Sequence, residues 1–126
     1  MKGLVLYGDV GQAVGIGVKG NKLQLWEVKE NEKIIMAEKL MDTDEAVKLK
    51  IEVKDGYKLK FYWSHDKNNW QELIGTDGEF YEGKFLPQWD RSARPGLIHF
   101  GNYDKPALFS FFKISYNLNS TYKRNF

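Results

Sequence analysis

Four carboxylates gathered in one loop-rich stretch, residues 75–94, are the first candidates for chemistry in this sequence: Asp77, Glu79, Glu82 and Asp90. Hydrolysis of a glycosidic bond needs two carboxyl groups across a cleft, one often with a raised pKa. Nothing in the spacing of these four places two of them on facing strands, and Glu79 and Glu82 lie next to glycines. We therefore expect solvated loop carboxylates here and no catalytic pair.

Other catalytic or metal-binding arrangements have little support in the sequence. His65 and His99 are the only histidines, and neither has a second histidine or a cysteine at ligand spacing. The chain has no cysteine, and Ser64 and Ser110 lack a nucleophile elbow. We expect no metal site, no cofactor and no catalysis by the chain alone.

Aromatic rings that alternate with inward-facing residues are more informative. If Leu23 and Leu25 point inward, Gln24 and Trp26 point to the other face, and the same alternation turns Tyr7 and Tyr62 outward. Sugar rings stack on exposed aromatic planes, so this pattern predicts a sugar-binding face. Its members are Tyr7, Gln24, Trp26, Lys50, Lys60 and Tyr62. Packing of the same rings against a neighbouring domain or a second copy is the alternative.

The segment from Phe85 to Gly96 is a second candidate recognition surface. It combines Trp89 with Arg91 and Arg94, and its prolines restrict the loop. The arginines are equally explained as structural clamps on carboxylates such as Asp90. Both interpretations stay open.

The charge pattern excludes some partners. The net charge is +2 and charges of both signs are interspersed, so we expect no binding to nucleic acid or to a membrane. The N-terminal residues lack an apolar run long enough for a signal peptide, which predicts a cytoplasmic location for the chain as written.

These side chains must be positioned by strands. The 126 residues fit one domain, and short alternating runs between turn signals predict an all-β, two-sheet antiparallel sandwich of the jelly-roll type. Gly20-Asn21 and Glu30-Asn31 are hairpin-turn candidates. The domain is expected over residues 1–116, with a polar tail at 117–126. Strands are expected at 3–8, 12–19, 22–28, 33–38, 47–54, 57–64, 69–74, 96–101 and 106–116.

The hairpin in residues 47–64 has a predictable register. Its apolar rows match when Val53 faces Leu59 and Ile51 faces Phe61, which requires a three-residue link, 55–57, with Gly56 at positive φ. In the turn after this hairpin, Trp70 is expected to pack back onto it.

Several of these features, taken in order, resemble the C-terminal concanavalin A-like β-sandwich of glycoside hydrolase family 43 enzymes, the β-xylosidases and α-arabinofuranosidases. The matching pieces are GLVLY, the paired strands KLKIEVKDGYKLKFYWS, Ser64, Asp66 and Trp70 with Leu73 and Gly75, and the closing GNYDKPALFSFFKISY. The resemblance implies an accessory sandwich without the catalytic propeller and without the family's first strands ahead of Gly3. Ser110 stands where family members often have an aspartate, which argues against a metal there, and Trp89 is our choice for the loop residue that reaches an active site.

We therefore expect a non-catalytic, carbohydrate-associated accessory module. Its expected partners are a plant cell-wall oligosaccharide or a glycosidase catalytic domain. Open strand edges in a shortened sandwich also predict a homodimer. The alternatives are a small xylanase-like glycosidase using two of the four carboxylates, and a protein-interaction sandwich.

Overall fold

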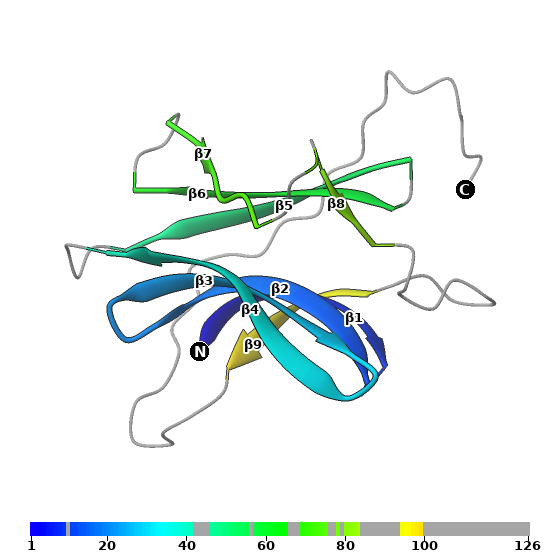
Figure 1. Ribbon diagram of the computed structural model, residues 1–126. Coiled ribbons are helices and arrows are strands. Elements are labelled where there is room, and N and C mark those ends of the chain that lie inside the picture. Colours follow the sequence, from blue (N-terminus) through cyan, green and yellow to red (C-terminus); the bar gives the residue numbers. More distant parts are fainter. Residues whose placement is uncertain are drawn as a thin grey trace.

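Two antiparallel β-sheets face each other in a computed structural model of the chain (Figure 1). The structure describes residues 1–9, 11–41, 46–55, 57–65, 69–75, 78, 80–83 and 94–99, with Asp9, Arg94 and His99 described by their backbone alone. The described residues contain strands and turns but no helix, so none of their elements is a helix that could cross a membrane. The predicted all-β, two-sheet sandwich is confirmed.

The larger sheet has five strands in the order β4-β3-β2-β1-β9. Their bounds are β1 Lys2–Asp9, β2 Gln12–Lys19, β3 Lys22–Lys29, β4 Glu32–Leu40 and β9 Arg94–His99. Two-residue turns join β2 to β3 and β3 to β4, because Lys19 pairs with Lys22 and Lys29 with Glu32. Positive φ values at Gly20, Glu30 and Asn31 fit these tight turns, which confirms both predicted hairpins.

The smaller sheet is built around β6. Its strands are β5 Lys48–Lys54, β6 Lys58–Ser64, β7 Gln71–Glu72 and β8 Tyr81–Glu82. The β5–β6 register pairs Val53 with Leu59 and Ile51 with Phe61, as predicted. Positive φ falls on Asp55, whereas Gly56, where we expected it, lies outside the described residues.

The space between the sheets holds the main hydrophobic core. Alternation sends every second side chain of β1, β2, β3 and β6 into it. Burial of each large apolar side chain contributes roughly 1.5–3 kcal/mol. The buried members are Leu6, Val14, Ile16, Leu23, Leu25, Met41, Leu59, Phe61, Trp63 and Tyr81. The face of the five-stranded sheet turned toward this core is called its inner face below, and the opposite face its outer face.

A β-bulge interrupts β4. Leu25 pairs with Ala37 and Trp26 with Ile35, so Met36 is an extra residue in β4. Met36 packs against the main core. The bulge shifts the inward–outward alternation of β4 by one residue. A residue before the bulge and a residue after it therefore lie on the same face only when their residue numbers differ by an odd number.

Some predicted strand limits were wrong. The strand expected at 69–74 is reduced to the two residues of β7, and the stretch predicted as loop contains β8 and the start of β9. Both short strands pair with β6 through two residue pairs each, too few for sequence alternation to reveal. The strand expected at 106–116 and the tail at 117–126 lie outside the described residues.

Candidate functional site

The outer face of the five-stranded sheet carries three of the predicted sugar-binding residues. Tyr7, Gln24 and Trp26 all lie there, as the alternation predicted. The prediction that this face is solvated is wrong for two of them, because Gln24 is 7% exposed and Trp26 is 2% exposed. Tyr7, at 46%, is open to solvent.

Trp26 is buried because small residues make room for its ring. It pairs with Gly15, where an added Cβ would lie 2.6 Å from a carbon of the indole. Together with Met1, Val5 and Ala13 it forms a second hydrophobic cluster. This packing leaves no face of the indole ring accessible to a sugar, so Trp26 is a structural residue of the sheet.

Gln24 is held by a charged neighbour on the adjacent strand. Its Nε2 donates to Glu38 Oε2 at 2.7 Å, and Lys22 Nζ lies 3.4 Å from Glu38 Oε1. The hydrogen bond from Gln24, followed by the nearby charge of Lys22, lowers the pKa of Glu38. Burial opposes this lowering of the pKa. Gln24 thus orders the β3–β4 edge.

Tyr7 and Arg94 come together although 87 positions separate them in the sequence. In the sheet, Tyr7 pairs with Ala13 on one side and with Arg94 on the other. Arg94 was expected in a loop but begins β9. Trp89 and Arg91 lie outside the described residues. The strand pairing therefore places an exposed aromatic residue directly beside an arginine.

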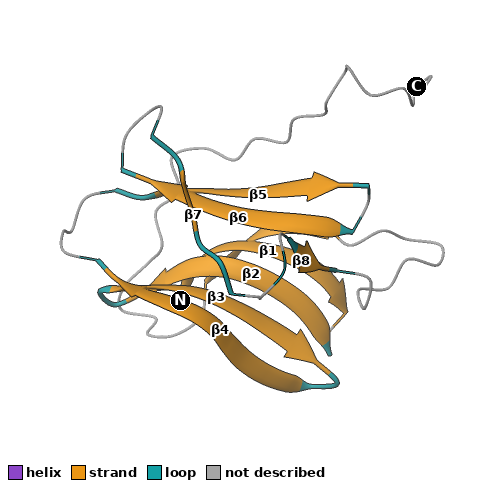
Figure 2. Cartoon of the chain, turned by 45° about the horizontal axis from the view of Figure 1, so that its top comes forward, coloured by secondary structure: helices purple, strands orange, loops and turns teal. Residues whose placement is uncertain are grey.

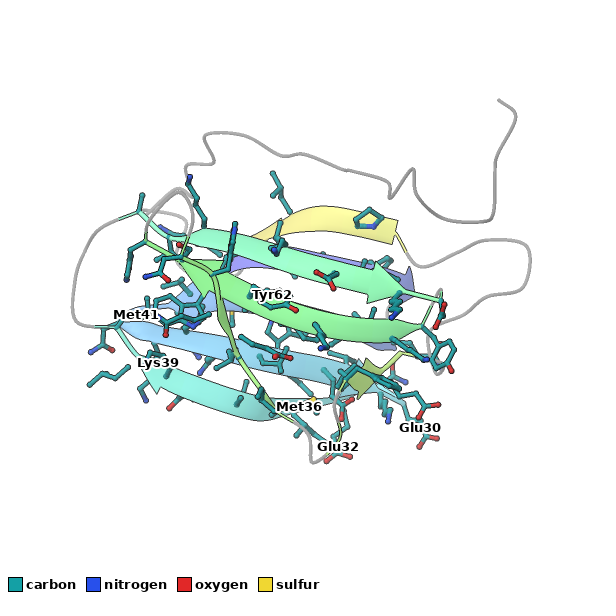
Figure 3. The ribbon with its side chains drawn as sticks, turned by 90° about the horizontal axis from the view of Figure 1, so that it is seen from above. Glu30, Glu32, Met36, Lys39, Met41 and Tyr62 are labelled. Carbon is teal, nitrogen blue, oxygen red and sulfur yellow. The ribbon has the colours of Figure 1, made fainter. Side chains whose placement is uncertain are left out.

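Tyr62 lies on the other side of the molecule. Seen from above in Figure 3, it sits on the four-stranded sheet, on the face turned away from the core. Lys50, its partner across β5–β6, shares that face, as does Lys60. The prediction of one surface containing Tyr7, Trp26 and Tyr62 is therefore wrong, because the core of the sandwich separates the two outer faces (Figure 2).

The Tyr62 ring already has a cationic neighbour. Lys50 Nζ lies 4.6 Å from the ring centre of Tyr62 and 4.7 Å from that of Trp70, within the range of cation–π attraction. This contact confirms that Trp70 packs back on the hairpin. Partial burial, and secondarily the charges of Glu52 and Glu72, raise the pKa of Tyr62. Lys50 occupies ring surface that a sugar would need.

A buried pair that the sequence analysis missed links the two sheets. Tyr81, on β8, donates its hydroxyl hydrogen to Glu27 Oε2 on β3. Both residues are buried. Burial, and then the bond to Glu27 and its charge, raise the pKa of Tyr81 far above its usual range. One signal was available: Glu27 continues the inward-facing series of Leu23 and Leu25.

The described residues offer little that could support catalysis. A cavity beside Leu25, Leu59 and Phe61 has about 10 Å³, which is room for roughly one water molecule. No three metal-binding side chains cluster within the described ranges. Of the four loop carboxylates, Glu82 is exposed on β8, while Asp77, Glu79 and Asp90 lie outside the description.

Comparison with known proteins bears on this arrangement. Residues 1–115 match the family model of the β-xylosidase C-terminal concanavalin A-like domain. Neither the curated proteins nor the solved structures gave a significant match. The match spans both sheets, from β1 to β9, and confirms the resemblance seen in the sequence.

Proposed function

The chain belongs to the family of β-xylosidase C-terminal concanavalin A-like domains, and we propose that it is a non-catalytic accessory domain that contacts xylose-containing oligosaccharides. The observation that carries the proposal is the backbone pairing of Arg94 with Tyr7, which is exposed on the outer face of the five-stranded sheet. The proposal assigns sugar contact to the β1–β9 end of that face.

The exposure of the three described aromatic candidates favours Tyr7. Trp26 is buried and Tyr62 has Lys50 over its ring, whereas nearly half of Tyr7 is accessible. An arginine adds hydrogen-bond donors for sugar hydroxyls, since a guanidinium carries five N–H groups. A ring and a guanidinium on adjacent strands supply the two kinds of contact that sugar recognition uses.

The buried carboxylate of Glu27 supports a non-catalytic role for this chain. Glu27 accepts the hydrogen of Tyr81 inside the sandwich and lies 3.9 Å from Lys29 Nζ. A glycosidase needs two carboxyl groups facing a substrate across a cleft. Glu27 instead faces the opposite sheet, so it serves the fold.

The test is a calorimetric titration of the chain with xylo- and arabino-oligosaccharides. We expect Tyr7→Ala and Arg94→Ala each to weaken xylo-oligosaccharide binding at least several-fold, because each removes one kind of contact. Tyr62→Ala is the matched control on the opposite face and should bind normally. Equal loss in the control, or no binding by the folded wild type, would reject the proposed site.

The same samples separate binding from catalysis. We expect no hydrolysis of nitrophenyl β-xyloside by the chain alone. Hydrolysis that a single substitution among Asp77, Glu79, Glu82 and Asp90 abolishes would establish the glycosidase alternative. Trp89→Ala and Arg91→Ala belong in the titration because both residues closely precede Arg94 in the sequence.

A further inference from the structure

The edge strand β4 exposes apolar side chains at its middle. It is nine residues long and lies at the end of the five-stranded sheet, with β3 as its one partner among the described strands. Ile34 is 44% exposed and Ile35 is 42% exposed at its middle. A long edge with exposed apolar residues invites pairing with another strand. Figure 3 shows Glu32, Met36 and Lys39 along this margin of the sandwich.

We propose that β4 pairs with β4 of a second copy of this chain, antiparallel, about a two-fold axis between Ile35 and Met36. This inference goes beyond the proposed function and does not depend on sugar binding. In this register Ile34 and Ile35 lie next to the axis, where the second copy covers them. Each copy contributes the same strand, as a two-fold interface requires.

On the outer face, the register places Lys33 opposite Glu38 of the second copy. Both residues are on that face, because Lys33 pairs with Val28 and Glu38 pairs with Gln24 on β3. Away from the axis, where the bulges of the two copies meet, opposed residues of an antiparallel pair must share a face. Five positions separate Lys33 from Glu38, so the bulge at Met36 is what turns them the same way.

On the inner side, the register places Glu32 opposite Lys39 of the second copy. Glu32 pairs with Lys29 and Lys39 pairs with Leu23, so these two also share a face. The two-fold axis repeats each pairing, giving four opposite-charge pairs across the interface. The charges of β4 thus complement a second β4.

Other registers do not achieve this match. A shift of one residue sets residues of opposite faces against each other, because the side chains of a strand alternate. A shift of two residues in one direction keeps the faces but sets Ile34 against Lys39 and Ile35 against Glu38. In the other direction it sets Ile34 against Ile35, and these two lie on opposite faces. The opposite charges of β4 are therefore matched in a single register. The strand that matches them at this edge is β4 of a second copy.

The test uses two charge reversals in sedimentation equilibrium, Glu32→Lys and Lys39→Glu. Either variant alone sets like charges against each other at two places, so its dimer dissociation constant should rise roughly tenfold or more. A 1:1 mixture of the two variants restores both opposite-charge pairs and should associate like wild type. Glu52→Lys, an exposed reversal on β5, is the matched control and should not change association.

Three outcomes would overturn the proposal. The first is a wild-type chain that stays at its monomer mass of 14.7 kDa at every concentration. The second is a mixture that associates no better than its components, and the third is a control that weakens association as much as the strand variants. Misfolding of a variant cannot imitate the expected result, because mixing does not repair a misfolded chain.

Discussion

Removing the hydroxyl of Tyr81 should cost the protein a substantial part of its stability. The change Tyr81→Phe keeps the ring, and with it the edge-on contact to Phe61 at a centroid distance of 5.9 Å. It removes the donor that serves the buried carboxylate of Glu27. A hydrogen bond to a charged group contributes about 1.5–3 kcal/mol. We therefore expect the free energy of unfolding to fall by about 2 kcal/mol, or on the order of 8 °C in Tm.

The difference in stability between wild type and Tyr81→Phe should depend on pH, because the pKa of Tyr81 is raised. A raised pKa means that the folded state keeps the phenol proton where the unfolded state begins to lose it, near pH 10. The stabilisation by Tyr81 is therefore fully present below pH 10 and falls as the pH rises above it, by about 1.4 kcal/mol per pH unit. The stabilities of wild type and variant should converge at alkaline pH.

Urea unfolding followed by tryptophan fluorescence from pH 7 to 11.5 measures both effects. Tyr62→Phe makes the same chemical change on an outer face, and at pH 7 it should alter stability by no more than about 0.5 kcal/mol. If Tyr81→Phe lowers the free energy of unfolding by no more than this control does, a stabilising Tyr81–Glu27 hydrogen bond is refuted. Parallel pH curves for wild type and Tyr81→Phe above pH 10 would refute the linkage argument.

Three further predictions use the same unfolding assay. Gly15→Ala should cost about 1–3 kcal/mol, because the new Cβ would meet backbone at 2.5 Å and the indole at 2.6 Å; Gly78→Ala, with its nearest atom at 3.5 Å, is the control and should cost clearly less. Lys50→Gln should cost about 0.5–1 kcal/mol and shift tryptophan fluorescence, because a cation is lost from two rings; an unchanged spectrum would contradict this contact. Glu38 has a lowered pKa, so its stabilisation is present above about pH 4.5 and is lost as the pH falls through its folded-state pKa. Gln24→Leu should flatten this acid dependence, and an unchanged acid profile would contradict the role given to Gln24.

Local sequence patterns predicted the hairpins well because a hairpin's register depends on nearby residues. The apolar rows of β5 and β6 match in one register, and the structure has that register, with Val53 opposite Leu59. In the turn between β2 and β3, Gly20 adopts the positive φ that a tight hairpin needs. These features span few residues, so alternation and turn chemistry suffice to predict them.

Features that depend on distant segments could not be predicted in the same way. Alternation showed that Trp26 faces away from Leu25. Whether that face is covered depends on Val5, in β1, and on Met1, which directly precedes β1. The same limit applies to Tyr7 and Arg94, since the pairing of β1 with β9 joins the two ends of the described chain. The order of strands within each sheet decides which candidates form a site.

We propose that this chain contacts xylose-containing oligosaccharides without cleaving them. Backbone amide shifts of the isotope-labelled chain, recorded during titration with a xylo-oligosaccharide, test it most directly, because the sugar's anomeric signals report hydrolysis in the same sample. We predict shift changes centred on Tyr7 and Arg94, none around Tyr62, and intact sugar throughout. Shift changes centred on Tyr62, no change at saturating sugar, or steady hydrolysis would contradict the account.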